Sequence, residues 1–277
     1  MQTLLNQGNV FKLVCGAGNE DYDAIFKLVN IYAKAGCRVF DVSANIEAVD
    51  AAKKGVLEAG VFFESFIGVS VGIADDPHMV VIDPKKCRHC MICTPECEYG
   101  AKYRKNKSLK EIIPKLVAMC VDFIEYHANS LKEVNVLRQW DYLQRVFPGV
   151  LSVCMDRSLL GSVQYILRIK RMLEGRVPYT TIIQADGNPM SGCCNDVATT
   201  LQAVATAQIV QKESLPAYLL VSGGTNPSTR KLCGQAGVNP HGIAMGTYAR
   251  DLVRGLSHKD AIDAAATLIR SCTNDNS

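Results

Sequence analysis

The sequence predicts a (β/α)8 barrel, and three observations lead to this fold class. Short apolar runs alternate with amphipathic stretches along almost the whole chain, as expected for a parallel sheet covered by helices. Eight such pairs can be counted. The length of 277 residues is close to the ~250 typical of this barrel. A doubly wound open sheet is the alternative arrangement of the same units.

The eight predicted strands are short apolar runs, and helical periodicity follows them. In chain order the strands cover residues 10–15, 38–43, 65–72, 121–127, 150–156, 179–186, 217–222 and 242–246. After the first strand, Ile25, Leu28, Val29 and Tyr32 share one helical face. The predicted helices cover residues 22–35, 46–59, 131–147, 163–173, 199–211, 228–235 and 249–256, and a third helix resumes at Ser108, with Glu111 completing a predicted capping box.

The composition indicates a globular protein and excludes two classes of partner. Apolar residues make up 48% of the chain, and 30 basic against 27 acidic residues give a net charge of +3. This balance argues against nucleic-acid binding, because nucleic-acid binders concentrate positive charge. No apolar run approaches the ~20 residues that cross a bilayer, and the first ten residues lack the pattern of a secretory signal. We expect a soluble, cytoplasmic protein without a membrane span.

Four of the twelve cysteines fall within eleven residues, after the third predicted strand. Cys87, Cys90, Cys93 and Cys97 are separated by two, two and three residues, the spacing with which bacterial ferredoxins hold a cubane iron–sulfur cluster. The fourth cysteine of such a run usually reaches a different cluster, and Glu98 stands where the ferredoxin pattern has proline. We predict one [4Fe-4S] cluster on this run, with Cys97 as the uncertain ligand.

Zinc is the competing interpretation of the same run. Cys-x2-Cys pairs with His89 nearby suit a tetrahedral zinc site, and the protein would then be a zinc-stapled interaction scaffold. A disulfide or free buried thiols fit less well, because the first ten residues lack the pattern of a secretory signal and we expect a cytoplasmic protein. Seven basic residues surround the run and either attract an anionic partner or form a solvated face: Lys85, Lys86, Arg88, Lys102, Arg104, Lys105 and Lys107.

The cysteine run also divides the predicted barrel. We interpret residues 74–107 as an insertion in the third strand-to-helix connection, and residues 1–73 and 108–277 as the barrel. Ligand sites of such barrels lie at the C-terminal ends of the strands. The insertion therefore emerges on the face where a ligand is expected.

Polar residues and cysteines end most of the predicted strands. Glu125 and His127 alternate to one side of the fourth strand, where a carboxylate and an imidazole make an acid/base pair. A core histidine satisfied by a neighbouring carboxylate has the same pattern. Asp186 is a third catalytic candidate, or it caps its own loop through an Asx turn. The strand-end candidates are Cys15, Asp41, Ser43, Ser70, Glu125, His127, Cys154, Asp156, Asp186, Ser222 and Gly246.

Glycine-rich turns follow the last two predicted strands. Barrels use such turns to direct backbone N–H groups at a phosphate, although tight turns need the same glycines. An enzyme with this site would be an iron–sulfur dependent oxidoreductase or lyase acting on a small phosphorylated or anionic substrate, in cofactor or metabolite biosynthesis. The candidate anion-binding residues are Ser222, Gly223, Gly224, Gly246 and Thr247, with Arg250 as a guanidinium fork.

Several stretches resemble the cyanobacterial light-dependent period protein family. They cover residues 8–16, 121–127, 184–192, 222–226 and 246–250, and Asp-Gly-Asn-Pro-Met-Ser-Gly from Asp186 is the most specific. The resemblance implies an iron–sulfur protein that senses cellular redox state and passes the signal to the circadian clock through protein partners. Members of the family carry two ferredoxin-like cysteine runs, whereas this chain has one.

A single run leaves the fourth cluster ligand open. The candidates are Cys97, Cys120, Cys15, Cys154 and Cys193. From the cysteine run, our first hypothesis is that the protein is a redox-responsive sensor or electron-transfer protein with a signalling or redox partner. The second is the barrel enzyme described above.

Overall fold

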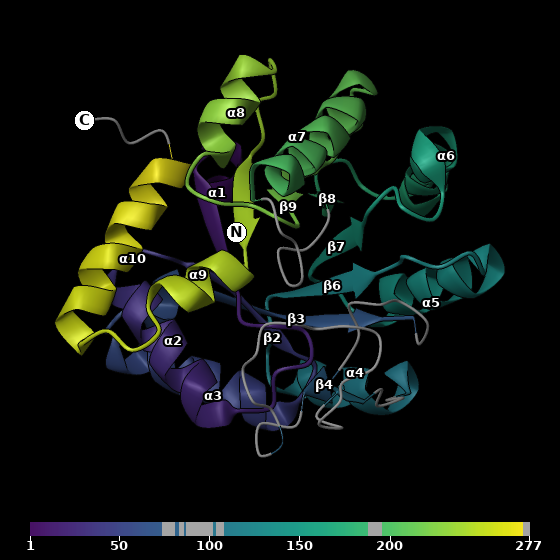
Figure 1. Ribbon diagram of the computed structural model, residues 1–277. Coiled ribbons are helices and arrows are strands. Elements are labelled where there is room, and N and C mark those ends of the chain that lie inside the picture. The colour runs from purple at the N-terminus through teal and green to yellow at the C-terminus, as the bar shows by residue number, and fades with distance from the viewer. Residues whose placement is uncertain (74–80, 83–85, 87–101, 104–107, 188–195, 274–277) are drawn as a thin grey trace.

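Eight parallel strands close into a barrel in the computed structural model, which describes residues 1–73, 81–82, 86, 102–103, 108–187 and 196–273 (Figure 1). The neighbour order is β1-β10-β9-β8-β7-β6-β3-β2. The (β/α)8 prediction is confirmed, and the open sheet is excluded. The strands are β1 (Val10–Val14), β2 (Val39–Ser43), β3 (Phe66–Gly72), β6 (Phe123–His127), β7 (Val150–Met155), β8 (Thr181–Asp186), β9 (Tyr218–Ser222) and β10 (Gly242–Met245).

Helices form a ring outside the strands (Figure 1). Asp21 and Asn45 begin two of them, because their side chains accept hydrogen bonds from backbone N–H groups of the first turn. Ser108 precedes the third barrel helix, but its side chain makes no capping hydrogen bond, so the predicted capping box is wrong. The helices are α1 (Gln2–Asn6), α2 (Tyr22–Lys34), α3 (Ile46–Glu58), η1 (Phe62–Glu64), α4 (Leu109–Ala118), α5 (Glu133–Val146), α6 (Gly161–Leu173), α7 (Asp196–Lys212), α8 (Thr229–Gln235), α9 (Thr247–Leu252) and α10 (His258–Cys272).

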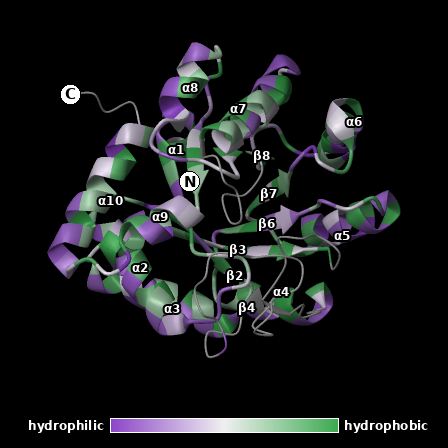
Figure 2. Cartoon of the chain, viewed as in Figure 1, coloured by the Kyte–Doolittle hydropathy of each residue, from purple (hydrophilic) through white to green (hydrophobic). Residues whose placement is uncertain are grey.

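The core has two parts, because successive side chains of a strand point to opposite faces. The larger part lies between strands and helices and includes Leu13, Phe40 and Val69. In Figure 2 the strands are mainly hydrophobic, whereas the helices carry many hydrophilic residues. The smaller part fills the barrel interior at the N-terminal ends of the strands, with residues such as Val10, Phe123, Ile182 and Tyr218.

Helix α1 covers the N-terminal end of the barrel. Its Leu5 is fully buried and belongs to the smaller core cluster, against which Met1 and Leu4 also pack. The sequence did not predict this helix, because five residues are too short to display helical periodicity. This apolar layer closes the N-terminal end of the barrel, so among the described residues the C-terminal mouth is where we look for a ligand site.

The connection between β3 and α4 contains a second, two-stranded sheet. β4 (Val81–Ile82) pairs antiparallel with β5 (Lys102–Tyr103), apart from the barrel sheet. The pairing of Ile82 with Lys102 brings the two flanks of the cysteine run together. Cys87, Cys90, Cys93 and Cys97, together with His89 and Cys193, lie outside the described residues.

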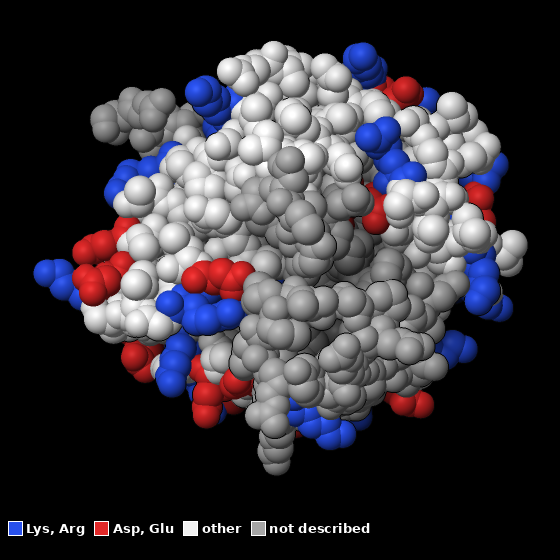
Figure 3. All heavy atoms as spheres, in the orientation of Figure 1, with Lys and Arg blue, Asp and Glu red and all other residues white. Residues whose placement is uncertain are grey.

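Basic and acidic side chains are interspersed around the margin of the face in Figure 3. This distribution agrees with the small net charge of +3. Within the part of the chain that the structure describes, none of the helices has both the length and the apolar character needed to span a bilayer.

Candidate functional site: an ion-paired cluster in the barrel interior

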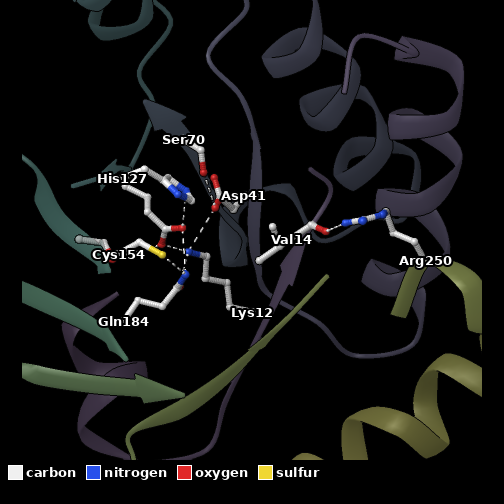
Figure 4. Close-up of polar contacts among 10 residues, drawn as sticks. Lys12, Val14, Asp41, Ser70, His127, Cys154, Gln184 and Arg250 are labelled. Carbon is white, nitrogen blue, oxygen red and sulfur yellow. Dashed lines mark hydrogen bonds and ion pairs between the residues drawn. The ribbon is translucent and has the colours of Figure 1, made fainter. Parts of the chain in front are cut away.

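Polar side chains meet in the barrel interior (Figure 4). Along the strands they follow the residues of the apolar layer at the N-terminal end. They come from six different strands, at positions that alternate with outward-facing core residues. All of them are buried. We call this group the interior cluster; it consists of Lys12, Asp41, Ser70, Glu125, His127, Ser152, Cys154 and Gln184.

Lys12 on β1 is the cation of the interior cluster. Its ammonium forms an ion pair with the Glu125 carboxylate and donates a hydrogen bond to Gln184 Oε1 at 2.8 Å. Asp41 Oδ2 lies 3.3 Å from the same nitrogen, and the Phe123 ring lies beneath it, with its centroid at 5.2 Å. An ammonium this deeply buried needs such partners, since an unpaired buried charge is costly.

Glu125 on β6 accepts hydrogen bonds at both carboxylate oxygens. Ser152 Oγ donates to Oε2 at 3.2 Å, and Gln184 Nε2 donates to Oε1 at 3.0 Å. His127 Nε2 lies 3.4 Å from Oε1. Glu125 and His127 therefore point into the barrel together, as the alternation on this strand predicted.

Asp41 on β2 is the second carboxylate next to Lys12. Its Oδ2 accepts a hydrogen bond of 2.8 Å from Ser70 Oγ on β3, and its Oδ1 has no hydrogen-bond partner among the described residues. This oxygen makes Asp41 the less well satisfied of the two carboxylates.

The pKa values of these groups diverge. Burial raises the pKa of the Asp41 carboxyl to about 6, although the Lys12 charge opposes the rise. Burial also acts to raise the pKa of Glu125, but the Lys12 ammonium and the contact with His127 outweigh it and place that pKa below its ordinary value. For Lys12, burial acts to lower the pKa, but the carboxylates of Asp41 and Glu125 outweigh burial and raise the pKa above its ordinary value. The Lys12 side chain therefore stays a charged ammonium. Two carboxyls with pKa values on opposite sides of the normal range can differ in protonation at one pH.

Asp186 ends β8 two residues beyond Gln184, and its carboxylate packs against Gly223 at the end of β9. A Cβ atom at Gly223 would collide with this carboxylate and would lie 2.6 Å from the Gly187 carbonyl oxygen. Gly223 also has a φ of +66°. Close packing and the positive φ therefore explain why a glycine is needed at position 223. A role of Gly223 or Ser222 in anion binding stays a prediction.

The remaining anion candidates lie at two places, with Gly246, Thr247 and Arg250 near the C-terminal ends of β1 and β10 and Gly224 after β9. Arg250 on α9 donates to the Val14 carbonyl oxygen at 2.9 Å and to Thr247 Oγ1 at 3.2 Å (Figure 4). Gly246 precedes α9, and a Cβ atom there would lie 3.1 Å from Arg250 Nη1. Gly224, with a φ of +85°, accepts a hydrogen bond from Thr200 Oγ1 at its carbonyl oxygen. These residues border the mouth of the barrel.

Two cysteines considered for the cluster are poorly placed for that role. Cys15 is fully buried in the core between strands and helices, and burial raises its thiol pKa far above the ordinary value. Cys120 is exposed, but it lies in the turn entering the N-terminal end of β6, whereas the segment that carries the cysteine run follows the C-terminal end of β3 in the chain. Cys154, by contrast, faces the barrel interior, and Gln184 Nε2 donates to its sulfur at 3.4 Å.

Sequence reasoning missed Lys12, Ser152 and Gln184. Each lies inside a predicted strand, whereas ligand sites of such barrels are expected at the strand ends. A signal was present, because Lys12 shares the strand face of Val10 and Val14 and is a charged residue in an otherwise apolar run. A lysine at such a position is almost never buried without a partner.

The fold and the interior cluster together define a closed parallel barrel with a charged, hydrogen-bonded interior below its C-terminal mouth. The chain belongs to the light dependent period A family, since the family model described as the light dependent period A C-terminal domain matches residues 115–273. It is also 26% identical to light dependent period A of Synechococcus elongatus over 291 aligned positions, which cover 89% of this chain and 81% of that protein.

Solved structures of other proteins share the barrel. The (S)-3-O-geranylgeranylglyceryl phosphate synthase of Thermoplasma acidophilum is similar with a TM-score of 0.50, at 15% identity and with 98% of this chain and 97% of that one covered. A truncated 3-deoxy-D-arabino-heptulosonate 7-phosphate synthase of Thermotoga maritima is similar with a TM-score of 0.52, at 11% identity and with 95% and 85% covered. At such low identity the similarity establishes the fold alone.

Proposed function

We propose that this protein binds one [4Fe-4S] cluster on the segment 74–107 and that the oxidation state of the cluster governs its interaction with a partner protein. The observation that carries the proposal is the spacing of Cys87, Cys90 and Cys93, because three thiolates separated by two residues suit one corner of a cubane. The pairing of β4 with β5 supports it, since it closes the segment that bears the run. Residues 1–73 and 108–277 serve as the barrel scaffold.

Membership of the light dependent period A family supports the redox role. The family resemblance implies a protein that responds to cellular redox state. It would pass this signal to the circadian clock only in an organism that has such a clock. The basic residues flanking the run suit a partner with an acidic surface. Cluster oxidation changes the charge next to these residues, and that change supplies a physical link between electron count and partner affinity.

Anaerobic purification tests the proposal directly. We expect brown protein with about four irons per chain, as one cubane requires, and a visible absorption that dithionite bleaches. Cys90→Ser should abolish the colour, while Cys233→Ser, which changes a buried cysteine of α8, should retain it. A colourless wild-type chain that holds zinc at the cysteine run would refute the iron–sulfur function and favour the zinc-stapled scaffold.

A second function, catalysis on a small anionic or phosphorylated substrate, is favoured by the interior cluster. Glu125 and His127 would exchange protons with the substrate, since they are in mutual contact below the mouth, with Asp186 at the end of the next strand but one. The anion would lie near Thr247 and Arg250. Inorganic phosphate should then raise the melting temperature of the wild-type chain by mass action.

Substitutions separate the two functions. Arg250→Met should remove the stabilisation by phosphate. The control Arg254→Met, which removes a surface ion pair between Arg254 and Asp251, should keep it. In cells whose chromosomal gene has been deleted, the double variant Glu125→Gln with Asp186→Ala should fail to restore wild-type behaviour if the protein acts as an enzyme. Full restoration by this double variant, together with failure of Cys90→Ser, would leave only the redox function.

A further inference from the structure

Three different metal-ligand side chains meet in the interior cluster. Glu125, His127 and Cys154 offer a carboxylate oxygen, an imidazole nitrogen and a sulfur, and these ligand atoms all lie within 4.8 Å of one another. All three residues are buried. Strand register explains the meeting, because His127 on β6 is directly opposite Cys154 on β7, and Glu125 is one interior position earlier.

The spacing of the first two ligands suits one metal ion. His127 Nε2 lies 3.4 Å from Glu125 Oε1. Two ligand atoms at about 2.0–2.1 Å from a zinc ion in tetrahedral geometry lie roughly 3.4 Å apart. The Gln184 side-chain nitrogen contacts both Glu125 Oε1 and the Cys154 sulfur, at 3.0 and 3.4 Å. This amide therefore holds the oxygen and the sulfur on the same side of the barrel, as outer-shell groups do around metal ligands.

The charges in contact with this group also favour a divalent cation. Lys12 carries one positive charge, whereas Asp41 and Glu125 carry two negative charges when ionised. The ionised trio is therefore negative by one charge inside the barrel, where an uncompensated charge is costly. A divalent ion that displaces the proton of the Cys154 thiol would bring the total to zero, since metal binding requires the thiolate.

We propose that Glu125, His127 and Cys154 form a mononuclear zinc site inside the barrel, separate from the cysteine run. The mixed nitrogen, sulfur and oxygen donors select zinc over magnesium or calcium, which prefer oxygen ligands alone. Three protein ligands leave the fourth position for water or a substrate atom, as in catalytic zinc sites. The proposal does not depend on the iron–sulfur function.

Metal analysis of the full-length chain, anaerobically purified and then supplied with zinc, tests the site. We expect one zinc per chain in addition to the iron of the cysteine run. Cys154→Ser should lose the zinc and keep the iron, whereas Cys90→Ser should lose the iron and keep the zinc. Cys233→Ser, a buried cysteine on α8, should keep both metals. Circular dichroism of each variant verifies that the fold is intact.

Opposite results would overturn the proposal. Wild-type protein without zinc at the barrel would do so, and so would zinc that disappears with Cys90→Ser but survives Cys154→Ser. Loss of iron in Cys154→Ser would instead assign this sulfur to the cluster and refute the zinc site.

Cobalt provides a second measurement that does not need the cluster. The chain with Cys87, Cys90 and Cys93 replaced by serine should bind one cobalt ion and display a sulfur-to-cobalt charge-transfer band. Addition of His127→Gln should weaken cobalt binding at least about 10-fold, the lower end of the loss seen when groups supporting a metal are changed. Addition of Cys154→Ser should remove the charge-transfer band. A band that survives Cys154→Ser would contradict the proposed ligands.

Discussion

Lys12 on β1 and Glu125 on β6 form a buried ion pair across the barrel interior, although 113 positions separate them in the chain. The two side chains are 2% and 1% exposed. If one partner is removed, water cannot reach the other charge to take its place. Gln184 contacts both partners, through its Oε1 and its Nε2. The pair is thus the centre of a network that joins strands from three parts of the sequence.

Lys12→Met should lower the free energy of unfolding by about 3–5 kcal/mol. The substitution leaves two buried carboxylates without their cation, and removal of one partner from a buried ion pair typically costs this much. Urea denaturation followed by circular dichroism measures the loss. Lys54→Met is the matched control, because Lys54 forms an exposed pair with Asp50 on α3 at 2.7 Å and should change stability by less than about 1 kcal/mol.

The double variant Lys12→Met with Glu125→Gln extends this prediction. It should be more stable than the sum of the single effects implies, because the second change removes a charge that the first left unpaired. Strict additivity of the two losses would mean that the pair does not interact in the folded protein.

Asp41→Asn should change the pH dependence of stability between about pH 4 and pH 6. In the folded wild-type chain the carboxyl has a pKa of about 6, against an ordinary 3.8, so in this window the folded state binds a proton that the unfolded state has released. The free energy of unfolding therefore falls as pH rises, by up to about 3 kcal/mol at roughly 1.4 kcal/mol per pKa unit.

Denaturation midpoints across the pH series measure this slope. Because Asp41→Asn has no carboxyl to titrate at this position, its free energy of unfolding should fall less than that of the wild-type chain between about pH 4 and pH 6. Glu125 acts in the opposite direction, because its lowered pKa gives stability that is lost as pH falls below its ordinary 4.5, and it is present in both proteins. Identical slopes for the two proteins would place the pKa of Asp41 near its ordinary value.

Leu5→Ala should cost about 2–5 kcal/mol, the usual range when a fully buried leucine is truncated. Leu5 is 0% exposed at the closed end of the barrel, so the loss would leave a cavity beside Val10 and Tyr218. Thermal or chemical denaturation gives the value. Leu57→Ala on α3, where the side chain is 64% exposed, should change stability by less than about 0.5 kcal/mol. Equal, small effects would indicate that α1 does not cover the barrel in solution.

Gly223→Ala should be far more damaging than Gly237→Ala. Both glycines have a φ of +66°, so each alanine pays a similar backbone cost of about 1 kcal/mol. At Gly237 nothing lies within 4 Å of the added Cβ, whereas at Gly223 the Cβ would meet Asp186 and Gly187. The difference between the two melting temperatures isolates the steric part. Comparable losses would mean that β8 and β9 separate easily at the mouth.

The order of the elements was predictable because local periodicity determines it. Strand and helix positions followed from alternation and from helical faces such as that of Ile25 and Val29, and the pairing of Glu125 with His127 followed from the two-residue period of a strand. Helix α1 and the missing Ser108 cap were not predictable, since a five-residue segment displays no period and a cap depends on one side-chain rotamer.

The eight strand-helix units and the cysteine spacing could be predicted from the sequence, because both depend on residues near one another in the chain. Folding of the whole chain was needed to place Lys12 between Asp41 and Glu125 and to bring Cys154 beside His127. Closure of the barrel brings distant strands around one small volume. There the balance of burial against neighbouring charge moves the pKa values of two similar carboxyls in opposite directions.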